Sequence, residues 1–392
     1  MARLFWSLVL VGVGVLAQLS PANHALWYVN LAVSEWGYWL IAPILLIWWP
    51  GWQSNAVGRC AALLALVAAV LVAMPIWKAY TYAQVIETQA LPVTGAAAIS
   101  ANADAPSRPA ALVVPDLIRG VRTPPINWHT QTYVTRGARP LEMDVFAPPP
   151  GTPSVGTGSR YPIVLVLHGG MMGPTWQAGD RHEALGLNRY LAARGYYVVA
   201  IDYRLATEAP YPAALEDVLV ALGELKKMGS PGGMDPSRVV IVGRGGGAHL
   251  GLMAAYTSGD PAIRGVVALY PPTDLPEWYR TPAVPSVADW QGWIHTFMGQ
   301  PLDETSSALY EAASPSRYAS TAPPTLLVHG ARDSIVPPTQ SQNLAIRLRQ
   351  FQRETLSFQL PWATHSCDMN FNGPCGQATT YLIERFLARY AA

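Results

Sequence analysis

Residues 239–250 read Val-Val-Ile-Val-Gly-Arg-Gly-Gly-Gly-Ala-His-Leu. The β-branched run Val239–Val242 is typical of a buried strand, and the residues from Gly247 onward predict a helix. The strand therefore passes directly into the helix through a glycine-rich turn. A turn of this kind, at the carboxyl end of a strand in an α/β sheet, is a position where functional sites are built.

This turn matches the pattern Gly-x-Ser-x-Gly at its outer positions, Gly243 and Gly247, but its centre is Gly245. In that pattern the central residue adopts a strained backbone conformation that lifts a nucleophilic hydroxyl above the sheet. Phosphate-binding turns are weaker alternatives. A P-loop requires Lys and Ser/Thr, which the turn lacks. A Gly-x-Gly-x-x-Ala dinucleotide turn belongs on the first strand of a sheet, whereas this strand comes late in the chain.

Other reactive groups follow predicted strands on both sides of this turn. A buried strand ends in His168-Gly169-Gly170, where glycines allow backbone N–H groups to bind a developing oxyanion. Asp333 follows a later strand, and His365 follows the last one. The order of nucleophile position, Asp and His is the order expected when each group follows a successive strand of an α/β sheet.

Apolar runs alternate with helical patterns from about Asp116 onward, which predicts an α/β fold with a mostly parallel central sheet flanked by helices. The predicted strands are Leu141–Phe146, Ile163–Leu167, Tyr197–Asp202, Val239–Val242, Gly265–Tyr270, Thr325–Val328 and Leu356–Leu360. The predicted helices are Glu183–Arg194, Pro212–Met228, Gly247–Tyr256, Gln340–Gln350 and Ala378–Tyr390. Residues 273–318 form an aromatic-rich insertion, which is a lid or substrate wall or, equally, an ordinary surface excursion.

These features together resemble the α/β-hydrolase fold, in its hormone-sensitive-lipase and acetyl-esterase-like branch. The stretches Tyr203–Glu208 and Tyr211–Asp217 are similar to a segment typical of that branch. The resemblance implies that Asp333 orients His365 and that His365 is the general base. It also implies an oxyanion hole formed by the N–H groups of Gly169, Gly170 and Gly246, and structural roles for Arg204 and Asp217. Gly245 then stands where the family has its nucleophilic serine.

Without a side chain at residue 245 the usual acyl-enzyme cannot form. Three explanations remain open: a deliberate serine replacement in an otherwise active esterase, a naturally inactive protein that binds a ligand or partner, and a site adapted to non-covalent acid/base chemistry. We favour the first, because the oxyanion turn, the acid and the base are all retained. The expected substrate is a small-molecule ester with an apolar acyl or aryl group. The predicted substrate-binding residues are Trp176, Trp290, Trp293 and Phe297.

The N-terminal part of the chain is strongly apolar. Three stretches, Leu4–Leu19, Ala25–Trp49 and Ala61–Trp77, approach the roughly 20 residues that a membrane-spanning helix needs. Tryptophan and tyrosine residues near their ends are typical of the headgroup level of a bilayer. We expect residues 1–80 to anchor the chain through two or three transmembrane helices, with a cleaved signal as the alternative for the first stretch. A linker at 81–115 and a hydrolase domain at 116–392 follow.

Arg3 and Arg59 are the positive charges that precede the third apolar stretch. Placing both in the cytoplasm predicts a multi-pass protein of the cytoplasmic (inner) membrane with its hydrolase domain on the periplasmic or extracellular side. In that oxidising compartment Cys367 and Cys375, the cysteines of the soluble portion, are expected to form a disulfide.

The overall composition argues against several other functions. The 26 basic and 25 acidic residues nearly balance, so no positive field favours nucleic acid. The eight histidines show no metal-ligand spacing with cysteines or carboxylates. The sequence therefore implies no metal and no cofactor, and it does not indicate an oligomeric state.

Overall fold

A computed structural model describes residues 1–94, 107–155, 160–170, 172, 180–228, 233–281, 283, 287 and 289–391. Its centre is an eight-stranded sheet with the strand order β1-β2-β4-β3-β5-β6-β7-β8. β2 pairs antiparallel with β1 and β4, and the strands from β4 to β8 are parallel. The predicted α/β fold with a mostly parallel sheet is therefore confirmed. The strands are β1 (Trp128–Arg136), β2 (Arg139–Phe146), β3 (Tyr161–Leu167), β4 (Tyr197–Ile201), β5 (Met234–Arg244), β6 (Ile263–Leu269), β7 (Thr325–Gly330) and β8 (Thr355–Leu360).

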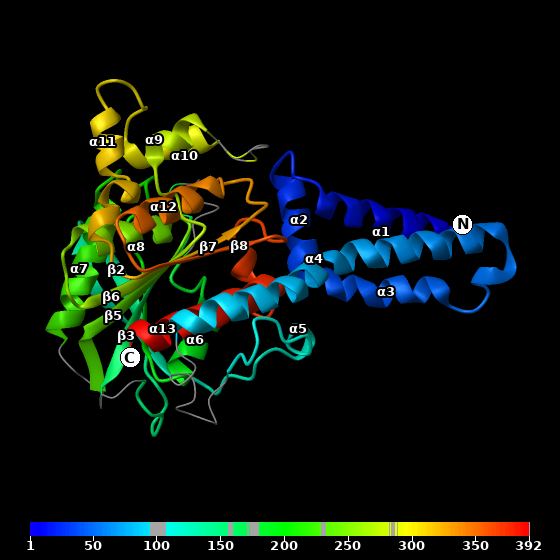
Figure 1. Cartoon of the computed structure of the whole chain (residues 1–392), viewed down its shortest axis with the longest axis horizontal. Helices are drawn as coiled ribbons and strands as arrows, with labels where there is room; N and C mark the ends of the chain where they lie inside the picture. Colours follow the sequence, from blue (N-terminus) through cyan, green and yellow to red (C-terminus); the bar gives the residue numbers. More distant parts are fainter. Residues whose placement is uncertain are drawn as a thin grey trace.

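Helices cover both faces of this sheet (Figure 1). They are α6 (Leu185–Ala193), α7 (Ala213–Lys227), α8 (Gly246–Thr257), α12 (Thr339–Gln350) and α13 (Pro374–Tyr390). The short helix α5 (Asp116–Arg119) lies away from the sheet, near the N-terminal helices. The predicted insertion at 273–318 contains α9 (Leu275–Arg280), α10 (Trp290–Met298) and α11 (Ser307–Ala312), which lie together at one end of the domain in Figure 1. The short 3₁₀ segments η7 (Pro315–Thr321) and η8 (Cys367–Met369) complete the domain.

The edge strand β1 was not predicted from the sequence. Its residues are Trp-His-Thr-Gln-Thr-Tyr-Val-Thr-Arg. Most of these side chains are polar, and only one of them is buried. An edge strand packs on one side only and commonly carries polar residues, so it lacks the continuous apolar run that identifies a central strand. It is joined to β2 by a tight hairpin in which Arg136 lies opposite Arg139 and Gly137 has a φ of 59°.

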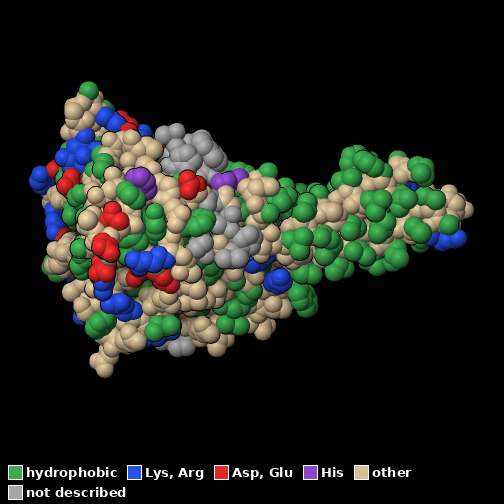
Figure 2. Space-filling view, turned by 90° about the horizontal axis from the view of Figure 1, so that it is seen from above, with side chains coloured by type: hydrophobic (Ala, Val, Ile, Leu, Met, Phe, Trp, Pro, Cys, Tyr) green, Lys and Arg blue, Asp and Glu red, His purple; other side chains and the backbone are tan. Residues whose placement is uncertain are grey.

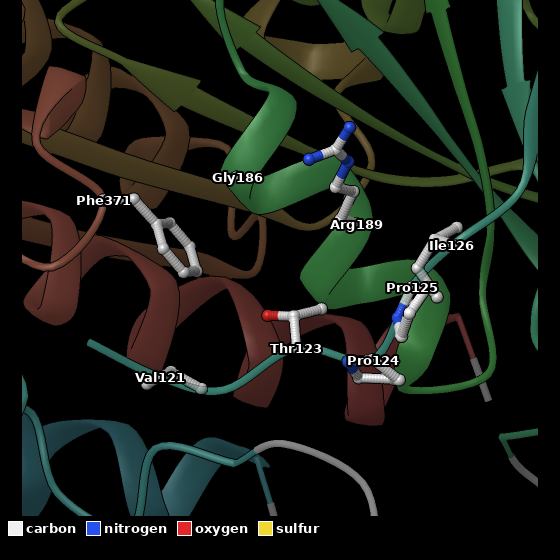
Figure 3. Close-up of a pocket in the computed structure, with 8 residues that line it drawn as sticks. All are labelled: Val121, Thr123, Pro124, Pro125, Ile126, Gly186, Arg189 and Phe371. Atoms are coloured by element: carbon white, nitrogen blue, oxygen red, sulfur yellow. The ribbon is translucent and has the colours of Figure 1, made fainter. Parts of the chain in front are cut away.

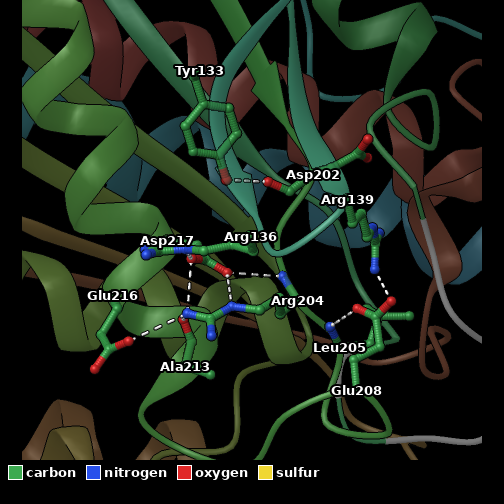
Figure 4. A network of polar contacts seen from close by, with 10 residues as sticks. All are labelled: Tyr133, Arg136, Arg139, Asp202, Arg204, Leu205, Glu208, Ala213, Glu216 and Asp217. Carbon is green, nitrogen blue, oxygen red and sulfur yellow. Dashed lines mark hydrogen bonds and ion pairs between the residues drawn. The ribbon is translucent and has the colours of Figure 1, made fainter.

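A buried carboxylate ties β1 to the elements beside it (Figure 4). Asp217 of α7 is fully buried and accepts hydrogen bonds from Arg204 Nε at 2.7 Å and from Arg136 Nε at 2.8 Å. Arg204 also donates to the carbonyl oxygen of Ala213. This network joins β1, the loop after β4 and α7, which agrees with structural rather than chemical roles for Arg204 and Asp217.

The N-terminal helices form a stalk that projects from the α/β domain (Figure 1). We define the stalk as residues 2–18, 37–48 and 56–77. It contains α1 (Ala2–Gln18), the short η1 (Gly37–Leu40), α3 (Ile41–Leu45) and η2 (Leu46–Trp48), and the first part of α4 (Ala56–Thr94). The turn η3 (Trp52–Ser54) lies at its far end, and α2 (His24–Trp36) lies at the neck beside the α/β domain.

The surface of the stalk is apolar. Figure 2 shows hydrophobic side chains along its length, with basic side chains at its far end and at its neck. Leu63 and Trp77, for example, are 64% and 67% exposed. Within the described residues, two segments are long and apolar enough to cross a membrane, His24–Trp48 and Ala56–Ala90. α1 is apolar but has 17 residues, or about 25 Å of helix. Of the two or three expected spanning helices, two segments therefore have the necessary length, and α1 is shorter.

The long helix α4 connects the stalk with the core of the α/β domain. Ala65, Ala68 and Val72 pack within the stalk, whereas Ala83 and Ile86 belong to the core cluster that contains the sheet. Residues 81–94 are therefore helical, although the sequence assigned them to a linker. The polar residues in this segment hid its helical continuation, because its burial is provided by the separated residues Ala83, Ile86 and Ala90 rather than by a continuous apolar run.

Candidate active site

The register of the sheet brings the predicted reactive segments to one edge. Leu167 pairs with Gly243, Arg244 with Leu269, and Gly330 with Leu360. The carboxyl ends of β3, β5, β6, β7 and β8 are therefore neighbours, and so are the loops that follow them. Residues that are far apart in the sequence meet there.

The turn between β5 and α8 has the geometry of a nucleophile elbow. Gly245 has φ 49° and ψ −113°, a conformation that residues with side chains rarely adopt. A Cβ placed on Gly245 would lie 3.7 Å from Nε2 of His365 and 3.8 Å from the ring of Tyr270, which are ordinary contact distances. A Cβ on Gly247 would lie 2.1 Å from the carbonyl oxygen of His168, so that position requires glycine. A side chain at residue 245 would thus strain the backbone but would fit, and it would face His365.

Asp333 and His365 form the predicted acid–base pair. Nδ1 of His365 lies 2.7 Å from Oδ2 of Asp333, and Oδ1 of Asp333 accepts hydrogen bonds from the amides of Ile335 and Val336. Burial by itself disfavours the carboxylate. The charge of His365 and the hydrogen bond from His329 outweigh that cost and hold the pKa of Asp333 below its usual range. The ionised acid can therefore fix the orientation of the His365 ring and leave Nε2 directed toward residue 245.

Tyr270 supports the base from a second direction. Its ring centroid lies 4.6 Å from that of His365, and its hydroxyl donates to Oδ1 of Asp368 at 2.7 Å. Asp368 in turn forms a buried ion pair with Arg244, at 2.7 Å. Burial and the nearby Asp368 raise the pKa of Tyr270, so the phenol remains a donor. Tyr270 has a φ of 42°, a strained value of the kind that clusters at functional sites.

The His-Gly-Gly turn lies against the elbow, as the close approach of His168 and Gly247 requires. The His168 ring stacks on Tyr203 with centroids 4.2 Å apart, and the Tyr203 hydroxyl donates to the carbonyl oxygen of His168. Gly170 has a φ of 72°. The amide of Gly169 is one of the predicted oxyanion donors. In this structure it donates a hydrogen bond to Oε2 of Glu183 at 2.6 Å. In this structure Gly169 therefore shapes the turn, and Gly170 and Gly246 remain the candidate oxyanion donors.

The aromatic residues predicted to bind substrate have different surroundings. Trp176 lies outside the described residues. Trp290 and Trp293 are partly buried on α10, where Trp290 donates to the carbonyl oxygen of Tyr279 and the Trp293 ring lies 6.4 Å from that of His24. Phe297 is 1% exposed and contacts the rings of Tyr211 and His249. It is part of the packed interior, and the role of all four in substrate binding stays a prediction.

The predicted disulfide between Cys367 and Cys375 is confirmed, with a Cα–Cα distance of 5.6 Å. It closes the loop that follows His365 and contains Asp368. The same loop is bonded to α2, because Asn370 donates to the carbonyl oxygen of Glu35 and the Cys375 amide donates to Oε2 of Glu35.

A surface cavity of about 530 Å³ lies beside this loop (Figure 3). Phe371 forms one wall, Gly186 and Arg189 of α6 form another, and the segment Val121–Ile126 closes it. Asp333, His365 and Gly245 are not among its lining residues, so this cavity is separate from the acid–base pair.

A protein-family model described as BD-FAE matches residues 143–348, which is more than half of the chain. The chain belongs to the BD-FAE family. The matched BD-FAE segment includes the His-Gly-Gly turn, the elbow and Asp333 and ends before His365, which is connected to it by the 2.7 Å contact with Asp333. The predicted resemblance to hormone-sensitive-lipase-like α/β-hydrolases is thereby confirmed.

Curated relatives of this BD-FAE protein include esterases of Mycobacterium tuberculosis. Esterase LipQ is 29% identical over 231 residues, which cover 55% of this chain and 53% of LipQ. The probable carboxylic ester hydrolase LipM is 28% identical over 256 residues, which cover 61% of this chain and 57% of LipM. The chain thus spans little more than half the length of these relatives.

Solved structures agree with the fold of the BD-FAE domain. Carboxyl esterase 2 from Tuber melanosporum superposes with a TM-score of 0.56 at 21% identity, covering 68% of this chain and 88% of that one. A thermophilic esterase from Thermogutta terrifontis has a TM-score of 0.51 at 19% identity, with 66% and 91% coverage. At these identities the likeness shows the fold alone.

Proposed function

We propose that this chain is a membrane-anchored carboxylic ester hydrolase whose activity is strongly impaired by glycine at the nucleophile position. The observation that carries the proposal is the alignment of three groups. A Cβ at residue 245 would lie 3.7 Å from Nε2 of His365, and Nδ1 of that ring is 2.7 Å from Asp333. A serine hydroxyl at residue 245 would be within reach of a base that is already oriented.

With serine at residue 245, hydrolysis would follow the two-step acyl-enzyme route. The serine oxygen attacks the ester carbonyl while its proton passes to Nε2 of His365. The amides of Gly170 and Gly246 stabilise the negative charge on the carbonyl oxygen. His365 then gives the proton to the leaving alcohol. Water, activated by the same ring, releases the acid and restores the serine.

With glycine at residue 245, the covalent route is closed. Loss of the nucleophile from a serine hydrolase costs on the order of 10⁶ in kcat, although oxyanion donors and binding can leave about 10³–10⁴ over the uncatalysed reaction. A water molecule activated by His365 is the route that remains. The acid, the base and the glycine turn are all retained, which supports replacement of the serine in an esterase rather than a site of different origin.

We further propose that the stalk is embedded in the cytoplasmic membrane and that the α/β domain lies on the periplasmic or extracellular side. The apolar surface of the stalk supports the anchoring. Arg3 donates to the carbonyl oxygen of Pro50 and Arg59 to that of Gln53, so both arginines lie at the far end of the stalk, opposite the α/β domain. Positive charges favour the cytoplasmic side, which supports the orientation. The substrate in this setting is an ester with an apolar acyl or aryl group.

A fluorophosphonate probe tests whether the site can activate a serine. The Gly245→Ser protein should gain the mass of one phosphonyl group on the peptide that contains residue 245, and the gain should disappear in Gly245→Ser/His365→Ala. The unaltered chain should not be labelled there. A Gly245→Ser protein that is folded but unlabelled would count against the esterase proposal.

A further inference from the structure

A second cavity lies at the neck, on the surface of the membrane-facing part of the molecule. It has a volume of about 660 Å³ and lies between α3, α4 and the segment around α5. Its walls are formed almost entirely by apolar and aromatic side chains, among them Trp39, Leu45, Trp77, Tyr80 and Ile118. None of the acid–base residues lines it.

Several large side chains that line this groove are exposed. Trp77 is 67% exposed and Ile118 is 66% exposed. Trp77 belongs to α4 of the stalk, whereas Ile118 belongs to α5 of the α/β domain. The apolar surface of the stalk therefore continues through the groove onto the domain itself. If the stalk is embedded in a bilayer, as proposed above, the groove opens to lipid and not to water.

Aromatic residues indicate the depth of the groove in the membrane. Tyr38, Trp39, Trp77 and Tyr80 all line it, and Trp and Tyr concentrate where the hydrocarbon meets the headgroups. A lipid at this level would place its acyl chain along the apolar walls and its phosphate beside the α/β domain.

Two basic residues follow the α5 wall of the groove directly in the sequence. Arg119 follows Ile118 directly at the end of α5, and Arg122 is three positions further. Both are exposed, and neither forms an ion pair with any residue in the described part of the chain. Asp116, the acidic residue of α5, is paired with Arg108 at 3.6 Å. The positive charge beside the groove is therefore not neutralised by α5 itself.

We propose that this groove binds one acyl chain of an anionic phospholipid whose phosphate is held by Arg119 and Arg122. The inference rests on the proposed membrane anchoring but not on ester hydrolysis. Bound in this way, the lipid fills the space between the stalk and α5. It thereby holds the α/β domain against the membrane surface.

The test is native mass spectrometry of the full chain released from nanodiscs made of equal parts phosphatidylglycerol and phosphatidylcholine. The unaltered chain should retain phosphatidylglycerol at least fivefold over phosphatidylcholine. Ala42→Trp, which places an indole in the groove at an exposed position, should reduce total retained lipid at least fivefold. Its control, Leu63→Trp, alters an exposed position on α4 that does not line the groove and should retain lipid normally.

The headgroup is tested separately. Arg119→Gln/Arg122→Gln should bring the ratio of the two lipids close to one, whereas Arg264→Gln/Arg349→Gln, which removes the same charge from exposed positions elsewhere, should leave the preference intact. Equal retention of both lipids by the unaltered chain, normal retention by Ala42→Trp, or a dimer in place of a lipid adduct would each overturn the proposal. A chain that does not incorporate into nanodiscs at all contradicts the anchoring instead, and activity of Gly245→Ser bears on neither result.

Discussion

Arg332 donates a 2.7 Å hydrogen bond to the carbonyl oxygen of Ala17, which lies 315 positions earlier in the chain. Its second Nη group donates to Leu19, so the guanidinium caps the carboxyl end of α1. Asn30 of α2 donates to the same two oxygens. Because Arg332 immediately precedes Asp333, the loop that carries the acid is fastened to the N-terminal helices.

We therefore expect Arg332→Ala to disturb catalysis as well as stability. In the Gly245→Ser background it should lower kcat for a short soluble ester about 10- to 100-fold while KM changes little, because the acid no longer holds His365 in register. Loss of the two hydrogen bonds from the guanidinium should also destabilise the protein by about 1–3 kcal/mol, while Asn30 still donates to both carbonyl oxygens. Arg349→Ala, at an exposed position on α12, is the control. An unchanged kcat in Arg332→Ala would show that the cap has no bearing on the acid–base pair.

His249 should make the fold sensitive to acid. It is fully buried on α8, and its Nδ1 donates to the carbonyl oxygen of Pro272. Burial lowers the pKa of His249 to about 4, whereas the unfolded chain titrates near 6.5. Between these values the unfolded state binds the extra proton. Stability is therefore full above about pH 6.5 and falls as the pH is lowered toward 4, by as much as about 3 kcal/mol.

Chemical unfolding in a mild detergent, measured from pH 7.5 to 4, checks this expectation. His249→Gln should flatten the dependence over that range even if it is less stable throughout, and His295→Gln, at an exposed position, should not. The same slope in His249→Gln and the unaltered protein would assign the acid sensitivity to another group.

The disulfide between Cys367 and Cys375 should stabilise the loop that follows the base. Closing so short a loop contributes about 2–3 kcal/mol in the chain-entropy model. Reduction, or Cys367→Ser/Cys375→Ser, should lower the melting temperature and, in Gly245→Ser, reduce kcat by loosening His365 and Asp368. Mass spectrometry of the unreduced protein should find neither thiol alkylatable. Alkylation of both would mean that the pair is reduced in the protein as isolated.

The orientation of the chain can be tested with reporters fused after Ala392. A phosphatase that folds only in an oxidising compartment should be active there, and a fluorescent reporter that matures only in the cytoplasm should be dark. The substitutions Arg3→Gln and Arg59→Gln should weaken this preference, because these positive charges at the far end of the stalk favour the cytoplasmic side. A bright cytoplasmic reporter with an inactive phosphatase would reverse the assigned topology.

The sequence predicted the central strands and the acid–base pair because both depend on local patterns. β-branched runs mark buried parallel strands, and Asp333 and His365 follow directly after two of them. It missed contacts that no pattern encodes. The Gly169 amide donates to Glu183, which lies 14 positions later in the chain. Tyr270 reaches His365 because the carboxyl ends of β6, β7 and β8 lie at the same edge of the sheet. The sequence could not link Arg332 to α1, because this contact depends on how the stalk packs on the α/β domain.

Replacement of Gly245 by serine should also have a cost in stability. The backbone at residue 245, with φ 49° and ψ −113°, suits glycine, and a side chain there introduces strain. Strain of this kind is on the order of 1–3 kcal/mol. Gly245→Ser should therefore melt at a modestly lower temperature than the unaltered protein, and Gly245→Ala should melt similarly low without gaining any activity.

The most direct test of the account is the rate of ester hydrolysis by Gly245→Ser across a panel of short, long and aryl esters. The account predicts little or no activity above background for the unaltered chain. Gly245→Ser should gain several orders of magnitude, and the gain should be lost again in Gly245→Ser/His365→Ala. A folded Gly245→Ser protein that is inert toward the whole panel would contradict the esterase proposal. A thermal shift of the unaltered protein with candidate ligands would then test the alternative of a binding protein.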